Sequence, residues 1–217
     1  MIRAIVFDFD GVIADSEPLH LRALQEVLAP LGLAVDREEY YARYLGYDDV
    51  GAFHAIAHDR GLEFSDGEVR ALISAKSIVY QSLLTGDGVL YPGVPACIER
   101  LAADYPLGIA SGALRHEIQA ILRAGALDHH FRFIVASGDT PSGKPAPDPY
   151  LKAAGLHGVP PAACVALEDS RWGIESAHAA GMKCVGITHT YPASQLSAAD
   201  VIVQRLDQFT PDLIRTL

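Results

Sequence analysis

The sequence lacks the features that mark disulfide-rich, metal-finger and nucleic-acid-binding proteins. It has only three cysteines in 217 residues, and their spacing fits neither a zinc site nor a disulfide framework. We expect Cys97, Cys164 and Cys184 to be buried free thiols in a reducing compartment. There is no run of basic residues, and the formal net charge is −10. Such an acidic chain is a poor partner for the phosphate backbone of nucleic acid.

Long apolar segments are also missing. No stretch approaches the roughly 18 apolar residues that a membrane-spanning helix needs. The N-terminus enters an apolar segment directly, without the basic region and cleavage site of a signal peptide. We therefore expect a cytoplasmic protein without a membrane partner. The oligomeric state stays open, with a monomer favoured over an oligomer.

Short apolar runs alternate with helical patterns over most of the chain. The first run, residues 2–7, reads as a buried strand that ends in a turn. Five similar runs follow, at residues 107–111, 131–137, 163–167, 184–188 and 201–203. The helical patterns between them cover residues 95–104 and 115–124, and begin again at Asp148-Pro149 and near Ser170. This alternation predicts an α/β fold with a doubly wound parallel sheet and helices on both faces.

Residues 15–88 interrupt the alternation. They contain no convincing strand. Four helical patterns occur instead, beginning near Ser16, Asp36, Asp48 and Asp66. We predict a discontinuous core domain of residues 1–14 and 89–217, and a helical cap domain of residues 15–88 inserted after the first strand.

Polar side chains follow four of the predicted strands. In chain order they are Asp8 and Asp10, Ser111 and Gly112, Lys144, and Glu168 with Asp169. Ligands of open α/β sheets bind outside the carboxyl ends of the strands, so we expect these groups to converge in one cleft. Each motif alone is often an ordinary turn, loop or helix cap. Four of them at four strand ends favour a functional site.

The acids of this set suit phosphoryl transfer. Asp8, Asp10 and Asp169 supply hard oxygen ligands of the kind that Mg²⁺ prefers. Asp8 directly ends its strand and is the candidate nucleophile, which would form an aspartyl-phosphate. Asp10, two residues further on, is the candidate acid and base.

The remaining groups can bind the phosphoryl oxygens. Lys144, the Ser111 hydroxyl and backbone N–H groups near Gly11 and Gly112 can neutralise their charge. Together these features predict a magnesium-dependent phosphatase whose partner is a small phosphorylated metabolite.

Four segments resemble the signature motifs of the haloacid dehalogenase-like hydrolase superfamily. They are DFDGVIADS at 8–16, IASGALRHEI at 109–118, GKPAPDPYL at 143–151 and LEDSRWGIESAHAAGMKCVGI at 167–187. They occur in order over nearly the whole chain. The length and the helical insertion resemble the subgroup that contains β-phosphoglucomutase and many sugar-phosphate and phosphoglycolate phosphatases.

The resemblance implies a Rossmann-like core with a four-helix cap that opens and closes. It makes Asp8 the nucleophile and a magnesium ligand, and Asp10 the acid and base, whose backbone carbonyl also binds the metal. The other implied positions are the metal ligand Asp169, the supporting acid Glu168 and the phosphate-binding pair Ser111 and Lys144.

Three cap positions are candidates for contact with the substrate. His20 shares a helical face with apolar residues, so it is either a core histidine or, by the resemblance, a residue that positions Asp10 or gates closure. Lys76, the one lysine of residues 15–88, lies on an apolar stripe. It either extends along the edge of that stripe into water or, by the resemblance, reaches the substrate. The third position is Gly46.

The loop at Gly46 departs from the pattern of β-phosphoglucomutase. There an arginine after the glycine holds a second phosphate, whereas this chain has Asp48 and Asp49. Acids at this place would repel the second phosphate that a mutase must hold. We therefore favour hydrolysis of a sugar phosphate and keep a mutase as the alternative.

Three further activities are less well supported. Dehalogenation needs neither Asp10 nor the pair Glu168-Asp169. Phosphonate cleavage would require Lys76 to form a Schiff base. A phospho-accepting signalling receiver would be shorter, with its aspartate after the third strand.

Overall fold

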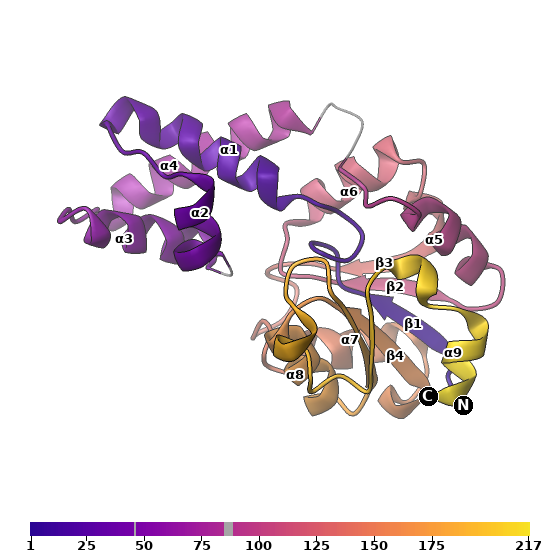
Figure 1. Ribbon diagram of the computed structural model, residues 1–217. Helices are drawn as coiled ribbons and strands as arrows, with labels where there is room; N and C mark the ends of the chain where they lie inside the picture. The colour runs from indigo at the N-terminus through magenta and orange to yellow at the C-terminus, as the bar shows by residue number, and fades with distance from the viewer. Residues whose placement is uncertain (46, 85–88) are drawn as a thin grey trace. The chain divides into compact units, whose positions relative to one another are not determined.

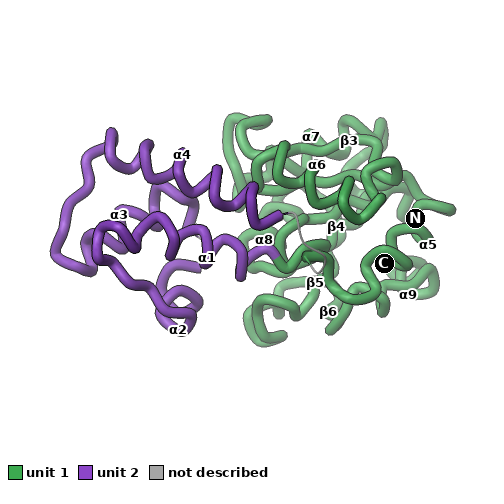
Figure 2. Tube along the Cα trace, turned by 90° about the horizontal axis from the view of Figure 1, so that it is seen from above, with its two compact units in different colours: residues 1–15, 87–217 green, residues 16–86 purple. Residues whose placement is uncertain are grey.

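The computed structural model describes residues 1–45, 47–84 and 89–217 (Figure 1). The chain divides into two compact units, a first unit of residues 1–15 and 87–217 and a second unit of residues 16–86 (Figure 2). None of the described helices has the length and apolar character that crossing a membrane requires.

The first unit is built on a six-stranded sheet in which all neighbouring strands run parallel. In spatial order the strands are β3 (Phe131–Val135), β2 (Leu107–Ala110), β1 (Ala4–Phe7), β4 (Cys164–Glu168), β5 (Lys183–Ile187) and β6 (Val201–Val203). The chain runs from β1 outward to β3 and then returns to the other side of β1 as β4. The strand order therefore reverses at β1, and such a switch point is where open α/β sheets bind ligands.

Helices cover the sheet on both faces, as predicted. α7 (Asp148–His157) and α8 (Arg171–Ala179) share one apolar cluster with Ala4 and Val6 of β1. α5 (Val94–Ala102) and α6 (Arg115–Ala124) lie on the other side of the sheet, and the short α9 (Pro211–Thr216) ends the chain (Figure 1). Every residue of β1 is buried, as expected for a strand covered on both faces.

The predicted elements of the first unit are present, with small shifts at their ends. The helix predicted at residues 115–124 has those bounds in α6. At the start of α7, the sequence indicates Asp148 as the N-cap and Pro149 as the first helical residue, whereas the helix begins one residue earlier, with Asp148 as its first residue and Pro149 as its second. A proline fits in the first turn because the N–H groups there have no partner within the helix. The three cysteines are free and buried, as expected.

The second unit contains helices and no strand among its described residues. The long helices are α1 (Glu17–Leu28), α3 (Asp49–Asp59) and α4 (Asp66–Leu83). The helix expected after Asp36 is shorter, because α2 (Arg37–Glu39) changes after one turn into the π-helical turn η2 (Tyr40–Tyr44). Asp36 still caps its start, with its carboxylate 2.8 Å from the N–H of Glu39. An apolar core that includes Leu24, Leu28, Phe53, Ile56 and Val69 joins the helices.

Candidate active site

Asp8 directly follows β1 and is buried. Its N–H donates to the carbonyl oxygen of Leu167 in β4 at 2.9 Å, which continues the sheet for one more residue. The chain then folds back, and the N–H of Gly11 donates to the carbonyl of Ala14 at 2.8 Å. Gly11 has a φ of +75°, and a β-carbon there would come within 1.8 Å of an Asp169 carboxylate oxygen. Only glycine fits this turn.

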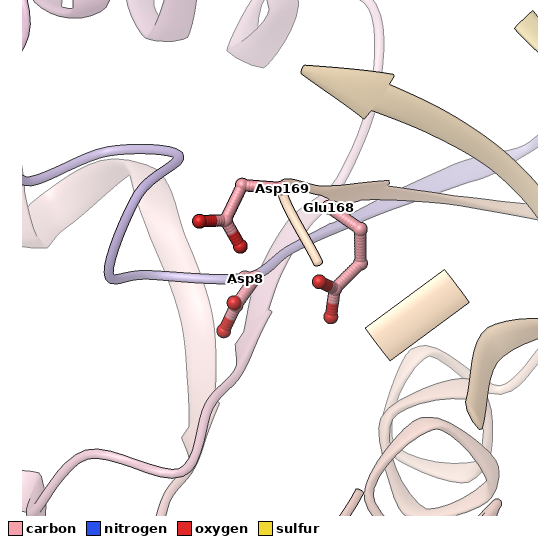
Figure 3. Close-up of side chains that lie close together, drawn as sticks. All are labelled: Asp8, Glu168 and Asp169. Carbon is pink, nitrogen blue, oxygen red and sulfur yellow. The ribbon is translucent and has the colours of Figure 1, made fainter. Parts of the chain in front are cut away.

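Three buried carboxylates meet at the end of β1 and β4. Asp8, Glu168 and Asp169 each place one carboxylate oxygen within 4.8 Å of the others (Figure 3). They come together because β1 and β4 are neighbours in register, with Phe7 opposite Leu167. The convergence expected from the strand ends is therefore present for these acids.

Lys144 joins this cluster from the loop before α7. Its ammonium nitrogen lies 2.9 Å from Oδ1 of Asp8 and 2.5 Å from Oε1 of Glu168. Burial alone would lower the pKa of Lys144, but the charges of Asp8 and Glu168 outweigh it and raise that pKa above its usual value. Lys144 is therefore a fixed positive charge beside the nucleophile candidate.

Glu168 has partners at both carboxylate oxygens. The Tyr150 hydroxyl donates to Oε1 at 2.6 Å, and the Ser170 hydroxyl donates to Oε2 at 3.2 Å. The carboxylate also occupies the space above Gly173, where a β-carbon would come within 1.8 Å of its carbon. Glu168 is thus held in one position, which suits a supporting acid. Tyr150 was missed from the sequence, although it lies in the segment GKPAPDPYL, because nothing in that pattern shows where its hydroxyl points.

The electrostatics of the cluster show an excess of negative charge. Burial raises the pKa of Asp8 to about 7, with Glu168 adding to the effect and Lys144 opposing it. Burial and the charges of Asp8 and Glu168 raise the pKa of Asp169 well above its usual value. One ammonium group faces three carboxylates here, so a bound cation would stabilise their ionised forms. The donor set, three carboxylates with hard oxygen atoms, fits a divalent cation.

The other predicted residues of the first unit lie at the same edge of the sheet. Asp10 is partly exposed, and its charge raises the pKa of Asp8. Ser111 follows β2 and is buried, with its Oγ 3.0 Å from the N–H of Ala113. At Gly112 a β-carbon would have no heavy atom within 4 Å, so its backbone borders open space. The structure brings Lys144 into contact with Asp8 and Glu168 and places Asp169 close to these acids. Ser111 and Gly112 follow the neighbouring strand β2.

Two of the predicted residues of the second unit, His20 and Lys76, contact each other within that unit. Lys76 is buried and forms an ion pair with Asp49, and its nitrogen lies 3.3 Å from Nδ1 of His20. The reading in which Lys76 extends along the edge of the stripe into water is therefore wrong. The His20 ring stacks on Tyr80 with 4.3 Å between ring centroids. Asp49 was missed as a partner, since sequence spacing does not link it to Lys76. Gly46 lies outside the described residues.

His20 is a neutral imidazole in this cluster. Burial, with the nearby charge of Lys76, lowers the pKa of His20 to about 3. The lysine ammonium only donates, so Nδ1 of the ring accepts and Nε2 carries the proton. The ring thus has an internal hydrogen-bond partner, as the core-histidine interpretation required.

Comparison with known proteins agrees with the motif pattern. Residues 5–187 match the model of the haloacid dehalogenase-like hydrolase family. Protein CbbY of Rhodobacter capsulatus is 35% identical over 209 residues, which cover 92% of this chain and 91% of that protein. The fructose-1-phosphate phosphatase YqaB of Escherichia coli is 33% identical over 183 residues, covering 84% and 95% of the two chains.

A solved structure extends the agreement to the fold. The structure of β-phosphoglucomutase from Clostridium difficile matches with a TM-score of 0.85 at 25% identity, covering 100% of this chain and 96% of that one. With its motifs, its sheet order and a family model that spans most of its length, this chain belongs to the haloacid dehalogenase-like hydrolase family.

Proposed function

We propose that the protein is a magnesium-dependent phosphatase that hydrolyses small phosphomonoesters, sugar phosphates in particular, through an aspartyl-phosphate on Asp8. The observation that carries the proposal is the buried cluster of Asp8, Glu168 and Asp169 with Lys144 at the switch point of the sheet. The named activity of the fructose-1-phosphate phosphatase among its relatives supports this substrate class.

In the first step a carboxylate oxygen of Asp8 attacks phosphorus and the bond from phosphorus to the ester oxygen breaks. Asp10 gives its proton to the departing oxygen, which leaves as an alcohol. In the second step Asp10 takes a proton from water, and the water oxygen attacks the phosphorus of the aspartyl-phosphate. The bond to Asp8 breaks, so phosphate is released and the Asp8 carboxylate is regenerated.

Positive charge at the site makes these steps possible. Lys144 lies 2.9 Å from Asp8 and offsets the charge of the phosphoryl oxygens together with the Ser111 hydroxyl and the backbone at Gly112. In this proposal Asp8, Asp169 and the backbone carbonyl of Asp10 would hold Mg²⁺. When bound, the ion supplies further neutralisation of charge on the phosphoryl group.

We assign residues 15–88 the role of a cap domain that selects the substrate. His20, Gly46 and Lys76 are its candidate residues for substrate contact or gating. The family resemblance is what supports this role.

Hydrolysis is favoured over phosphate transfer by the charge of the second unit. Residues 16–86 contain eleven acidic residues and six lysines or arginines, a net charge of −5. The one lysine already has Asp49 as its counter-ion. A mutase must hold a doubly phosphorylated sugar, and a negative unit with a paired lysine is poorly suited to a second phosphate. The likeness to β-phosphoglucomutase keeps sugar phosphomutase as the second candidate.

The test is a phosphate-release screen over a panel of sugar phosphates, with and without Mg²⁺. The panel includes β-glucose 1-phosphate with a bisphosphate primer, to detect transfer between sugar positions. We expect release of phosphate that stops when Mg²⁺ is chelated and returns when it is restored. If the products contain isomerised sugar phosphate and no free phosphate, the protein is a mutase and not a phosphatase.

The matched variants for this screen are Asp8→Asn and Asp104→Asn. Asp104 is exposed and far along the chain from the acid cluster, so its variant should keep wild-type turnover. Asp8→Asn should abolish turnover while the thermal unfolding transition remains cooperative. Turnover by Asp8→Asn near the rate of the control would contradict the assignment of the nucleophile.

A further inference from the structure

The segment after β5 contacts the turn that carries Asp10. Nδ1 of His189 lies 3.0 Å from the carbonyl oxygen of Gly11, which is 178 residues away in the chain. A carbonyl oxygen only accepts hydrogen bonds, so Nδ1 of His189 must carry a proton and donate it. The contact therefore joins the loop after β5, which has no assigned role, to the loop that follows the nucleophile candidate Asp8.

His189 is held in the orientation that this hydrogen bond needs. Its ring stacks on Tyr91, with 3.9 Å between ring centroids and 27° between the planes. Burial lowers the pKa of His189, while the bond to Gly11 and the charge of Asp15 oppose that effect. The imidazole is thus a neutral, partly buried donor with one fixed tautomer.

The residue beside His189 is part of the same contact. The Thr190 hydroxyl is hydrogen-bonded to Asp169, a contact that opposes the rise in the pKa of that acid. A β-carbon at Gly11 would come within 2.6 Å of the Thr190 hydroxyl oxygen and 1.8 Å of Asp169. Two consecutive side chains of this segment therefore hold the Gly11 turn and Asp169 against each other.

The Gly11 turn is a part of the site that such a contact can stabilise. Gly11 follows Asp10 directly and has a φ of +75°, and its backbone has more freedom than that of any other residue type. Phe9 and Ala14 hold the turn from within by backbone hydrogen bonds. Of the hydrogen bonds described, that of His189 is the one that fixes the orientation of the Gly11 carbonyl.

We propose that His189 is a positioning residue for Asp10. By fixing the Gly11 carbonyl it sets the backbone that carries the Asp10 carboxyl, and so keeps that carboxyl directed at the oxygen that leaves in the first step. This inference rests on the proposed function, in which Asp10 protonates the leaving oxygen.

The role makes a prediction that depends on the leaving group. p-Nitrophenolate leaves readily without a proton, whereas the alkoxide of a sugar phosphate needs one in the transition state. Loss of the His189 hydrogen bond should therefore lower kcat/KM for a sugar phosphate and spare kcat/KM for p-nitrophenyl phosphate. A merely structural residue would lower both values by the same factor, because unfolded enzyme is lost to both substrates alike.

The experiment compares His189→Phe, which keeps a ring to stack on Tyr91 but has no donor, with His189→Asn, which keeps a nitrogen donor. The exposed His116 gives the matched controls His116→Phe and His116→Asn. For each purified protein with Mg²⁺, kcat/KM is measured for fructose 1-phosphate and for p-nitrophenyl phosphate. Thermal unfolding is recorded in parallel.

We expect His189→Phe to lower the ratio of the two kcat/KM values, sugar phosphate over aryl phosphate, by about tenfold or more, a part of the 10²–10⁴-fold that general acids contribute. His189→Asn should restore the ratio to within about threefold, and the His116 variants should leave it unchanged. An unchanged ratio in His189→Phe, or no recovery in His189→Asn, would overturn the positioning role. Wild-type enzyme that hydrolyses neither ester would instead refute the proposed function itself.

Discussion

Two hydrogen-bond donors share one carboxylate oxygen of Glu168 in the site. Oε1 of Glu168 accepts hydrogen bonds from both Lys144 and Tyr150, at 2.5 and 2.6 Å. The ammonium of Lys144 contacts both Asp8 and Glu168. The position of the Glu168 carboxylate therefore influences how closely the Lys144 ammonium can approach Asp8. The Tyr150 hydroxyl shares in holding that carboxylate.

Tyr150→Phe tests this relation without altering the shape of the core. Loss of the hydroxyl leaves Glu168 with one partner fewer, and we expect a loss of about 1–3 kcal/mol in unfolding free energy. We also expect a several-fold lower kcat, because Lys144 is then drawn closer to Glu168 and away from Asp8. Urea unfolding and phosphate-release kinetics measure the two effects. Wild-type values of both would show that the hydroxyl has no such role.

His157 links the stability of the first unit to pH. It is buried against the Phe133 ring at 4.5 Å between centroids, and burial, together with the charge of Arg132, lowers its pKa. In the unfolded chain a histidine has a pKa of about 6.5. The folded form therefore binds the proton less well, and this contribution to stability is full above that pH and lost as the pH falls below it.

His157→Gln removes that dependence. Between about pH 7.5 and 5.5, the unfolding free energy of the wild type should fall more steeply than that of the variant. Chemical denaturation at a series of pH values measures the difference. Parallel curves for the two proteins would show that His157 contributes nothing to the pH dependence.

At the scale of elements, α8 can start close to the acid cluster because Gly173 has no side chain. Gly173 lies in its first turn, under the Glu168 carboxylate, and the Ser170 hydroxyl caps the helix by accepting from the Gly173 N–H at 3.1 Å. The helix can therefore begin directly beneath the acid cluster.

Gly173→Ala should disturb both the helix start and the site. The new β-carbon would overlap the Glu168 carboxylate, so we expect a loss of about 1–3 kcal/mol in unfolding free energy and a large loss of activity. The control is Gly155→Ala in α7, where a β-carbon meets no atom within 4 Å. Alanine there should stabilise the protein by about 0.5–1 kcal/mol. Denaturant titrations measure the unfolding free energy of both variants. Equal changes in the two variants would contradict the overlap expected at Gly173.

In the second unit the ion pair of Asp49 and Lys76 joins α3 to α4. Lys76 is buried while Asp49 is partly exposed, so Asp49→Asn leaves a buried ammonium without its counter-ion. We expect this variant to lose about 1–3 kcal/mol, less than for a fully buried pair because water reaches Asp49. Adding Lys76→Met should restore part of the loss in the same urea titration. A double variant no more stable than Asp49→Asn would argue against the pairing.

At the scale of the whole molecule, the sequence predicted what depends on local patterns. Apolar runs marked the strands, and the polar residues that follow Phe7, Ala110 and Leu167 marked the edge where the site lies. Parallel strands bring their carboxyl ends to one edge, so Asp8, Glu168 and Asp169 could be placed together without a structure.

Contacts between residues far apart in the sequence were not predictable in this way. The bond from His189 to Gly11 spans 178 residues, and that from Lys76 to Asp49 spans 27. No spacing rule relates such pairs, because their meeting depends on how whole elements pack. The π-helical turn at Tyr40–Tyr44 was not predictable either, because the acidic cap at Asp36 indicates only where a helix begins.

The central claim is that the phosphoryl group passes through Asp8, and reductive trapping tests it most directly. The enzyme is mixed with a sugar phosphate and Mg²⁺, quenched in acid within one turnover and reduced with borohydride, which converts an aspartyl-phosphate to homoserine. Peptide mass spectrometry then identifies the modified residue. The account predicts homoserine at position 8 and none in protein incubated without substrate. Homoserine at another aspartate, or full turnover by Asp8→Asn, would contradict it.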